Sequence, residues 1–162
     1  SAGGGGGAGS GNGYLGRRAG WSPAAREADE LEELAAKSCI LPQNNTLQNK
    51  DQPFIDELAI QLRRIFGSEN VRTNFPVINS KGKPVEIDIE TPNAIIEVKS
   101  GGATGLGSQV EVRVKDPMLN PTGKPVIGYG PERMKGAVYD YINTHGGIAA
   151  RNIDEILDII VP

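Results

Sequence analysis

The chain has 162 residues, of which 38% are hydrophobic, and its 17 basic and 20 acidic residues give a formal net charge of −3. This length suits one domain of ordinary size with an appendage, and the acidic balance argues against a protein that coats nucleic acid with a broadly basic surface. The single cysteine, Cys39, excludes an intrachain disulfide and a zinc site built from several cysteines.

The N-terminal third of the chain differs in composition from the rest. Residues 1–21 are predicted to be a linker, because their glycine-rich beginning has no side chains with which to form a core. Residues 22–52 are predicted to hold a satellite helix and its connection, with Ser22 as the N-cap and Pro23 at the first helical position. We assign residues 53–162 to the folded domain.

From residue 53 onward the hydrophobic pattern becomes regular. Apolar residues at helical spacing predict a helix over residues 54–66, which Gly67 ends. Further strands are expected over residues 71–78, 84–90, 94–99 and 125–129, with a short one at 147–149, and helices are expected over 132–144 and after Asn152.

Residues 109–115 fit two patterns. Val110, Val112 and Val114 alternate as in a strand, whereas Leu106, Val110 and Val114 would share one side of a helix. We predict a helix, because a parallel strand at 125–129 needs a crossover of about a dozen residues before it. The resulting order predicts an α/β fold with a mixed central sheet flanked by helices.

Acidic residues interrupt the two apolar strands at the centre of this sheet. Alternation predicts that Asp88 points to the face opposite Ile87 and Ile89. On the following strand, the same alternation places Glu97 and Lys99 on one face.

The turn between the two strands decides whether the acids meet. If Pro92 and Asn93 centre a four-residue turn, Asp88 lies directly opposite Glu97. Pro92 excludes the usual type I′ turn, and a three-residue loop would put Asp88 on the wrong face.

Two opposed carboxylates destabilise a sheet unless a positive charge lies between them, and a divalent cation would supply it. The same register places Lys99 opposite Glu86, so a cross-strand ion pair in a nonenzymatic domain is the other interpretation of the lysine.

Asp88 and the segment Glu97-Val98-Lys99, with a helix before them and a helix and a strand after them, resemble the PD-(D/E)XK nuclease superfamily and its restriction-endonuclease-like fold. The resemblance covers about residues 53–161. The proline that usually precedes the aspartate is Ile87 in this chain.

This resemblance implies that Asp88 and Glu97, with the carbonyl group of Val98, hold a divalent cation. Mg²⁺ is expected first, with Mn²⁺ or Zn²⁺ as alternatives. Lys99 would position the attacking water or neutralise developing charge.

In this family a third acid usually comes from the first helix. Glu57 is our first candidate and Asp56 the alternative, and a third interpretation makes both of them ordinary surface acids.

A narrower resemblance is to the C-terminal toxin domains of bacterial contact-dependent growth inhibition proteins. The glycine-rich residues 101–107 and the segment 120–129 carry it. It implies a secreted or cell-surface protein larger than this fragment, nucleic-acid cleavage in the cytoplasm of the target bacterium, and a cognate immunity protein in the producer. The N-terminus has no apolar signal-peptide segment, so export would depend on sequence outside the fragment. No apolar run approaches the roughly 18 residues that span a bilayer, so we expect no stable membrane insertion by this fragment.

Gln109, Arg113 and Lys115 are predicted to contact nucleic acid. Such toxins often attack tRNA, and the lack of a long basic stripe suits a compact substrate, so tRNA is favoured over DNA. A binding module that keeps the fold without catalysis is the rival prediction. The single histidine, His145, is expected to contact carbonyl groups at the end of a helix.

Overall fold

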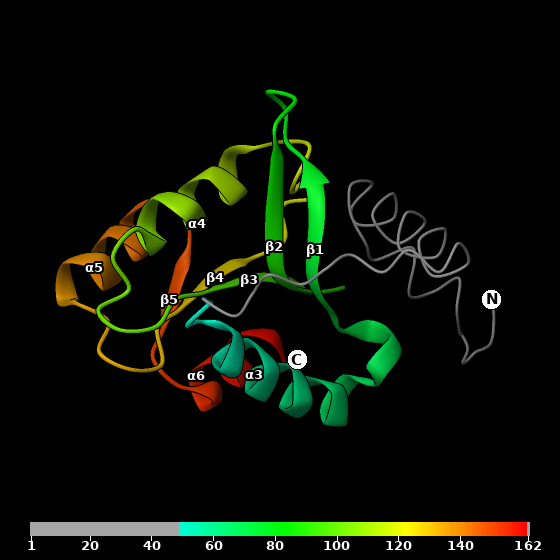
Figure 1. Cartoon of the computed structure of the whole chain (residues 1–162), viewed down its shortest axis with the longest axis vertical. Coiled ribbons are helices and arrows are strands. Elements are labelled where there is room, and N and C mark those ends of the chain that lie inside the picture. The colour runs from blue at the N-terminus through cyan, green and yellow to red at the C-terminus, as the bar shows by residue number, and fades with distance from the viewer. Residues whose placement is uncertain (1–48, 162) are drawn as a thin grey trace.

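A computed structural model of the chain is shown in Figure 1, and the structure describes residues 49–161. The predicted linker at residues 1–21 and the predicted satellite helix lie outside the described residues. Among the described helices, none has the length and apolar character needed to cross a bilayer.

Five strands form one mixed sheet in the order β1-β2-β3-β4-β5. The strands are β1 (Arg72–Ile78), β2 (Pro84–Thr91), β3 (Ala94–Val98), β4 (Val126–Tyr129) and β5 (Ile148–Ala150). β1, β2 and β3 are an antiparallel meander, and β4 and β5 continue the sheet in parallel with β3. The predicted α/β class is therefore confirmed, and the acidic β2–β3 hairpin lies in the middle of the sheet.

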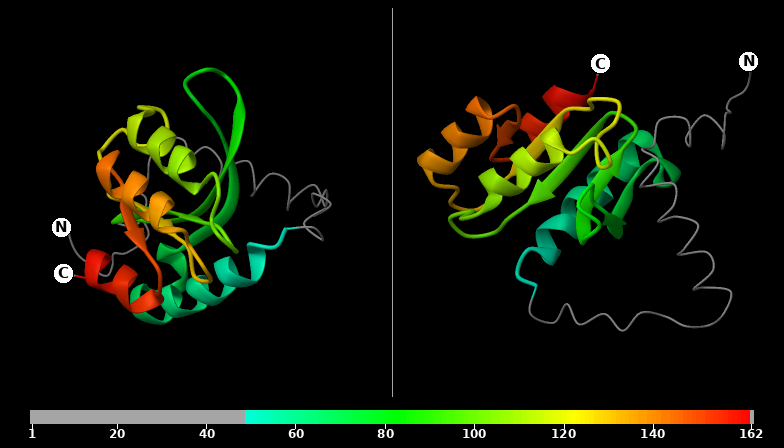
Figure 2. Two further views of the ribbon diagram at one scale, coloured as in Figure 1. Left: turned by 90° about the vertical axis from the view of Figure 1, so that its left-hand side faces the viewer. Right: turned by 90° about the horizontal axis from the view of Figure 1, so that it is seen from above.

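Four helices of the described chain cover the two faces of the sheet (Figures 1 and 2). They are α3 (Gln52–Phe66), α4 (Leu106–Lys115), α5 (Gly136–Thr144) and α6 (Ile153–Ile160), and a short 3-10 helix, η2 (Ser68–Asn70), follows α3. α3 and α6 pack on one face, and α4 and α5 pack on the other. The segment with the ambiguous pattern is thus the crossover helix α4, as the topological argument predicted.

Each helical layer encloses its own hydrophobic core. All five residues of β3 and all four of β4 are buried, as expected for strands with a helix on both faces. Ile95 belongs to the core beneath α4 and α5, and Ile96 belongs to the core beneath α3 and α6. Asn152 fixes the start of α6, because its side chain accepts a hydrogen bond from the N–H group of Glu155 at 2.9 Å.

The alternation expected along β2 breaks at Asp88. Ile87 packs in the core beneath α4 and α5, whereas Ile89 packs in the core beneath α3 and α6, so the prediction that they share a face was wrong. The neighbouring strand is irregular at the same point, because Asn74 of β1 lies between Thr73 and Phe75, the partners of Ile89 and Ile87, and has a φ of 52°. Asn tolerates this left-handed conformation better than most residues. Gln52 holds the Asn74 side chain through two hydrogen bonds, at 2.9 and 3.1 Å.

Candidate active site at the acidic hairpin

Asp88 and Glu97 meet across the β2–β3 hairpin. Ile89 pairs with Ile96, which confirms the predicted register and places Asp88 opposite Glu97. Asp88 Oδ2 accepts a hydrogen bond from the N–H group of Val98 at 2.8 Å. Glu97 is 1% exposed and points towards α4. The two carboxylates therefore share one side of the hairpin.

Both acids line a cavity of about 370 Å³ between the hairpin, α4 and the turn that precedes α3. Most of the residues that line it are polar or charged. They are Asn49, Asp51, Val85, Glu86, Asp88, Glu97, Val98, Gln109 and Arg113. Gln109 and Arg113 are one helical turn apart, so the same side of α4 presents both.

Arg113 is a cation in contact with this acidic pair. Its Nε lies 3.5 Å from Oε2 of Glu97, and its Nη2 donates a hydrogen bond to the carbonyl oxygen of Glu86 at 3.0 Å. Neither Nε of Arg113 nor Oε2 of Glu97 has a hydrogen-bond partner among the described atoms. A buried carboxylate oxygen without such a partner is costly, so Glu97 has unused capacity to bind a donor or a cation. Arg113, which we predicted to contact nucleic acid, is only 6% exposed here.

The pKa values of both acids are raised. Burial raises the pKa of Asp88 from 3.8 to about 6; the N–H group of Val98 opposes this shift, and the carboxylates of Glu86 and Asp51 increase it. Burial also raises the pKa of Glu97 well above its usual value, with a further contribution from the charge of Asp88. Acids with strongly shifted pKa values in a cavity are typical of functional sites, because catalysis and binding need ionisable groups in places where burial makes their charged form unfavourable.

Besides Asp88 and Glu97, the cavity is lined by two further acids, Glu86 on β2 and Asp51 in the N-terminal region. Asp51 is the N-cap residue of α3, and its Oδ1 accepts a hydrogen bond from the N–H group of Ser100 at 2.7 Å. Glu57, our first candidate, is exposed outside the cavity lining, where its charge adds to burial in raising the pKa of Tyr129. Asp56 is also exposed and accepts a hydrogen bond from Gln52 at 2.8 Å. The missed signal was the position of Asp51, just before a helix with proline in its first turn.

Lys99 follows directly after β3 and is half-buried. Its N–H group donates to the carbonyl oxygen of Tyr129 at 3.0 Å. Within residues 49–161 no ion pair joins Lys99 to Glu86, whose carboxylate accepts a hydrogen bond from Asn74 at 3.2 Å. The alternative interpretation of Lys99 as a cross-strand ion pair therefore has no support in the structure.

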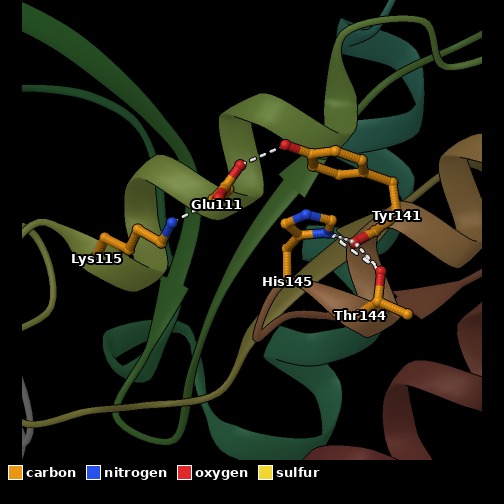
Figure 3. Close-up of polar contacts among 5 residues, drawn as sticks. All are labelled: Glu111, Lys115, Tyr141, Thr144 and His145. Carbon is orange, nitrogen blue, oxygen red and sulfur yellow. Dashed lines mark hydrogen bonds and ion pairs between the residues drawn. The ribbon is translucent and has the colours of Figure 1, made fainter.

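Lys115 lies outside the cavity lining and contacts Glu111, the residue of α4 that also meets Tyr141 of α5 (Figure 3). Its Nζ donates to Glu111 at 2.6 Å, and Glu111 also accepts a hydrogen bond from the hydroxyl group of Tyr141 at 2.5 Å. The ring of Tyr141 stacks on the ring of His145 at 3.7 Å, and Nδ1 of His145 lies 2.7 Å from the Tyr141 carbonyl oxygen. His145 thus has the helix-end role that we expected, and the charge of Lys115 is balanced by Glu111.

The residues of the cavity suit a hard cation in part. Mg²⁺ prefers oxygen ligands such as the carboxylates of Asp88 and Glu97, and one oxygen of Glu97 accepts no hydrogen bond from the protein. Mg²⁺ also usually keeps several water ligands. Among the residues that the structure describes, no three Asp, Glu, His or Cys side chains are grouped closely enough to enclose a metal ion. The protein would therefore supply two carboxylates, with water and substrate completing the coordination.

Comparisons of the chain with protein-family models, with curated proteins and with solved structures return no match. The function must therefore be argued from the chemistry of the site.

Proposed function

We propose that this chain is a metal-dependent nuclease that hydrolyses phosphodiester bonds in the cavity beside the β2–β3 hairpin. The observation that carries the proposal is the pair of half-buried Asp88 and buried Glu97, opposed across the hairpin, with one Glu97 oxygen that accepts no hydrogen bond. Arg113 supplies one positive charge to these two carboxylates, and a divalent cation would balance the charge that remains. The element order also supports a restriction-endonuclease-like fold, since a helix, a three-stranded meander, a crossover helix and a parallel strand follow one another.

Four residues in or beside the cavity have a role in this proposal. Asp88 and Glu97 would hold Mg²⁺, which when bound polarises a phosphate oxygen and lowers the pKa of a water ligand. Lys99, next to the cavity-lining Val98, would stabilise the negative charge that develops on the phosphate. Gln109 offers an amide group to the substrate from α4.

The substrate that we propose is tRNA, with DNA as the alternative, in the cytoplasm of a competing bacterium. The resemblance of residues 101–107 and 120–129 to growth-inhibition toxin domains supports this proposal. The proposal also includes delivery of this chain as part of a larger secreted or cell-surface protein, and a cognate immunity protein in the producing cell.

A second candidate function is a noncatalytic binding module. The contact between Arg113 and Glu97 favours it, because a guanidinium group at 3.5 Å already provides positive charge beside the buried carboxylate. In such a module Arg113 would take the place of the metal permanently, and the protein would bind no divalent cation in this cavity.

Cleavage and metal binding separate the two functions. The protein would be incubated with total tRNA and with plasmid DNA in Mg²⁺, Mn²⁺, Zn²⁺ or a chelator, and Mg²⁺ binding would be measured by calorimetry. We expect metal-dependent cleavage that Asp88→Asn and Glu97→Gln abolish, whereas Asp56→Asn, the same change at an exposed acid, retains it. Full turnover by a folded Asp88→Asn protein would refute the assignment of the site.

A further inference from the structure

The loops that follow β3, β4 and β5 meet at one edge of the sheet. Parallel strands bring their carboxyl ends to the same edge, which is where α/β proteins commonly bind ligands. The first two loops are joined by hydrogen bonds from Arg133 N–H to Gly101 O at 3.0 Å and from Lys135 N–H to Gly102 O at 3.1 Å. They lie side by side at the left of Figure 1, between β3 and α4 and before α5.

Four cations gather on these loops, and we call them the loop-edge surface: Lys99, Arg133, Lys135 and Arg151. Arg133, Lys135 and Arg151 are exposed, and Lys99 is half-buried. In the part of the chain that the structure describes, none of the four forms an ion pair with a carboxylate. The cations that we first predicted to bind nucleic acid differ in this respect, because Arg113 and Lys115 both face a glutamate.

Contacts with the protein hold two of these cations in place. The stem of Lys135 lies against Gly102, where a Cβ atom would be only 3.1 Å from its Cε. The guanidinium group of Arg151 lies 4.2 Å above the ring of Tyr139 and donates to the carbonyl oxygen of Met134 at 3.3 Å. Ordered cations lose less side-chain entropy when they bind an anion, so they bind it more tightly than freely rotating ones.

Three carboxylates of the protein already occupy backbone donors at this edge. Glu132 accepts a hydrogen bond from the N–H group of Gly101 at 2.6 Å, Glu155 accepts one from the N–H group of Arg151 at 2.6 Å, and Asp51 accepts one from the N–H group of Ser100 at 2.7 Å. Four cations beside these three carboxylates leave a small excess of positive charge at the edge of a chain whose net charge is −3. The positive charge is therefore local and small in extent.

The loop-edge surface continues into the acidic cavity. Ser100, which precedes the first loop glycine, donates its N–H to Asp51, and Asp51 lines the cavity. Lys99 is bonded directly to Val98, which also lines it. The first loop therefore begins directly beside residues that line the cavity.

We propose that the loop-edge surface binds the phosphate backbone of an RNA substrate and leads one phosphodiester into the acidic cavity, an inference that rests on the proposed nuclease function. Positive groups beside the cavity attract phosphate. The acids inside the cavity repel phosphate, so a bound cation must neutralise them before a phosphate group can enter. A patch of four cations interrupted by carboxylates fits a few phosphates of a compact folded RNA, whereas duplex DNA is met by longer basic stripes.

Binding without cleavage tests this surface. Affinity for labelled tRNA would be measured in chelator at several salt concentrations, with Asp88→Asn in every protein so that no substrate is cut. The loop variant carries Arg133→Gln with Lys135→Gln. The matched control carries Arg64→Gln with Lys81→Gln, which changes the net charge equally at the far end of α3 and in the β1–β2 turn.

We expect the loop variant to bind tRNA about tenfold more weakly and to lower the slope of log affinity against log salt by roughly 1.5, since two phosphate contacts are lost. The control should stay within about twofold of the parent. Glu132→Gln, which keeps an oxygen for the Gly101 N–H, should raise the affinity.

Each result supports or overturns the inference. Equal affinity of the loop variant and the control would overturn it, and tighter binding of duplex DNA than of tRNA would overturn the choice of RNA. If the protein with Asp88 intact cuts no nucleic acid but the loop variant still loses tRNA binding, the surface is supported and the nuclease proposal fails. If it cuts tRNA while the loop variant binds normally, the surface alone fails.

Discussion

Replacing Asp88 with asparagine should stabilise the metal-free protein at pH 8 and leave its stability at pH 4 almost unchanged. Burial raises the pKa of Asp88 from 3.8 to about 6 in the folded state. Between these two pH values the folded protein binds more protons than the unfolded chain, so stability falls as the pH rises from about 4 to about 6 and stays low above it. Asparagine carries no charge, and its oxygen can still accept the Val98 N–H.

The size of the effect follows from the pKa shift. Two pKa units correspond to about 3 kcal/mol, which is an upper bound because water and neighbouring groups adjust around the ionised acid. We therefore expect a gain of roughly 1–3 kcal/mol at pH 8, which would raise the melting temperature by about 4 °C or more. The variant should also show a shallower dependence of stability on pH between about 4 and 6.

Urea unfolding in chelator at pH 4, 6 and 8 measures this gain, and Asp116→Asn is the matched control. Asp116 is buried too, but hydrogen bonds from Ser80 and Met118 hold its pKa below the usual value against the effect of burial. Such an acid stabilises the fold above its unfolded pKa and loses this contribution as the pH falls, so Asp116→Asn should destabilise at pH 8. A loss of stability in Asp88→Asn at pH 8, or an unchanged pH dependence, would refute the reasoning.

Two further predictions concern stability and the extent of the domain. In urea titrations, Lys124→Met should lower the free energy of unfolding by about 3 kcal/mol or more, because it removes the cation at 2.5 Å from the buried carboxylate of Glu90. Adding Glu90→Gln to this variant should restore part of the lost stability. A fragment that begins at Asn49 should unfold cooperatively and retain cleavage of tRNA. A fragment that begins at Gln52 should fold but cleave tRNA more weakly, because it lacks Asp51, which lines the cavity and binds Ser100. Equal activity of the two fragments would contradict a role of Asp51 in cleavage.

Periodicity predicted most of the fold because the parallel strands and their helices are regular. The sequence could not predict the change of face between Ile87 and Ile89. That change coincides with the left-handed backbone conformation of Asn74, whose side chain is held by contacts from α3 and β2. Such contacts join residues far apart in the chain, so a local pattern does not reveal them.

The site was predictable to the extent that it is local. Asp88 and Glu97 belong to one hairpin, so turn length and register were enough to oppose them. The partner of Glu97 was not predictable, because it depends on which side of α4 faces the sheet. Asp51 was not anticipated as a residue of the cavity, because it reaches the cavity from the N-cap position of α3, one turn or more before Asp56 and Glu57.

The topology of the sheet also affects how the chain folds. β1, β2 and β3 pair with neighbours in sequence, whereas β3 and β4 can pair only after the chain has passed through α4. Short loops close at a lower entropic cost than long ones, so we expect the meander to form early. Asp88 and Glu97 then come together before Arg113 arrives on the crossover helix. The repulsion between the two acids therefore acts on the folding rate as well as on the finished domain.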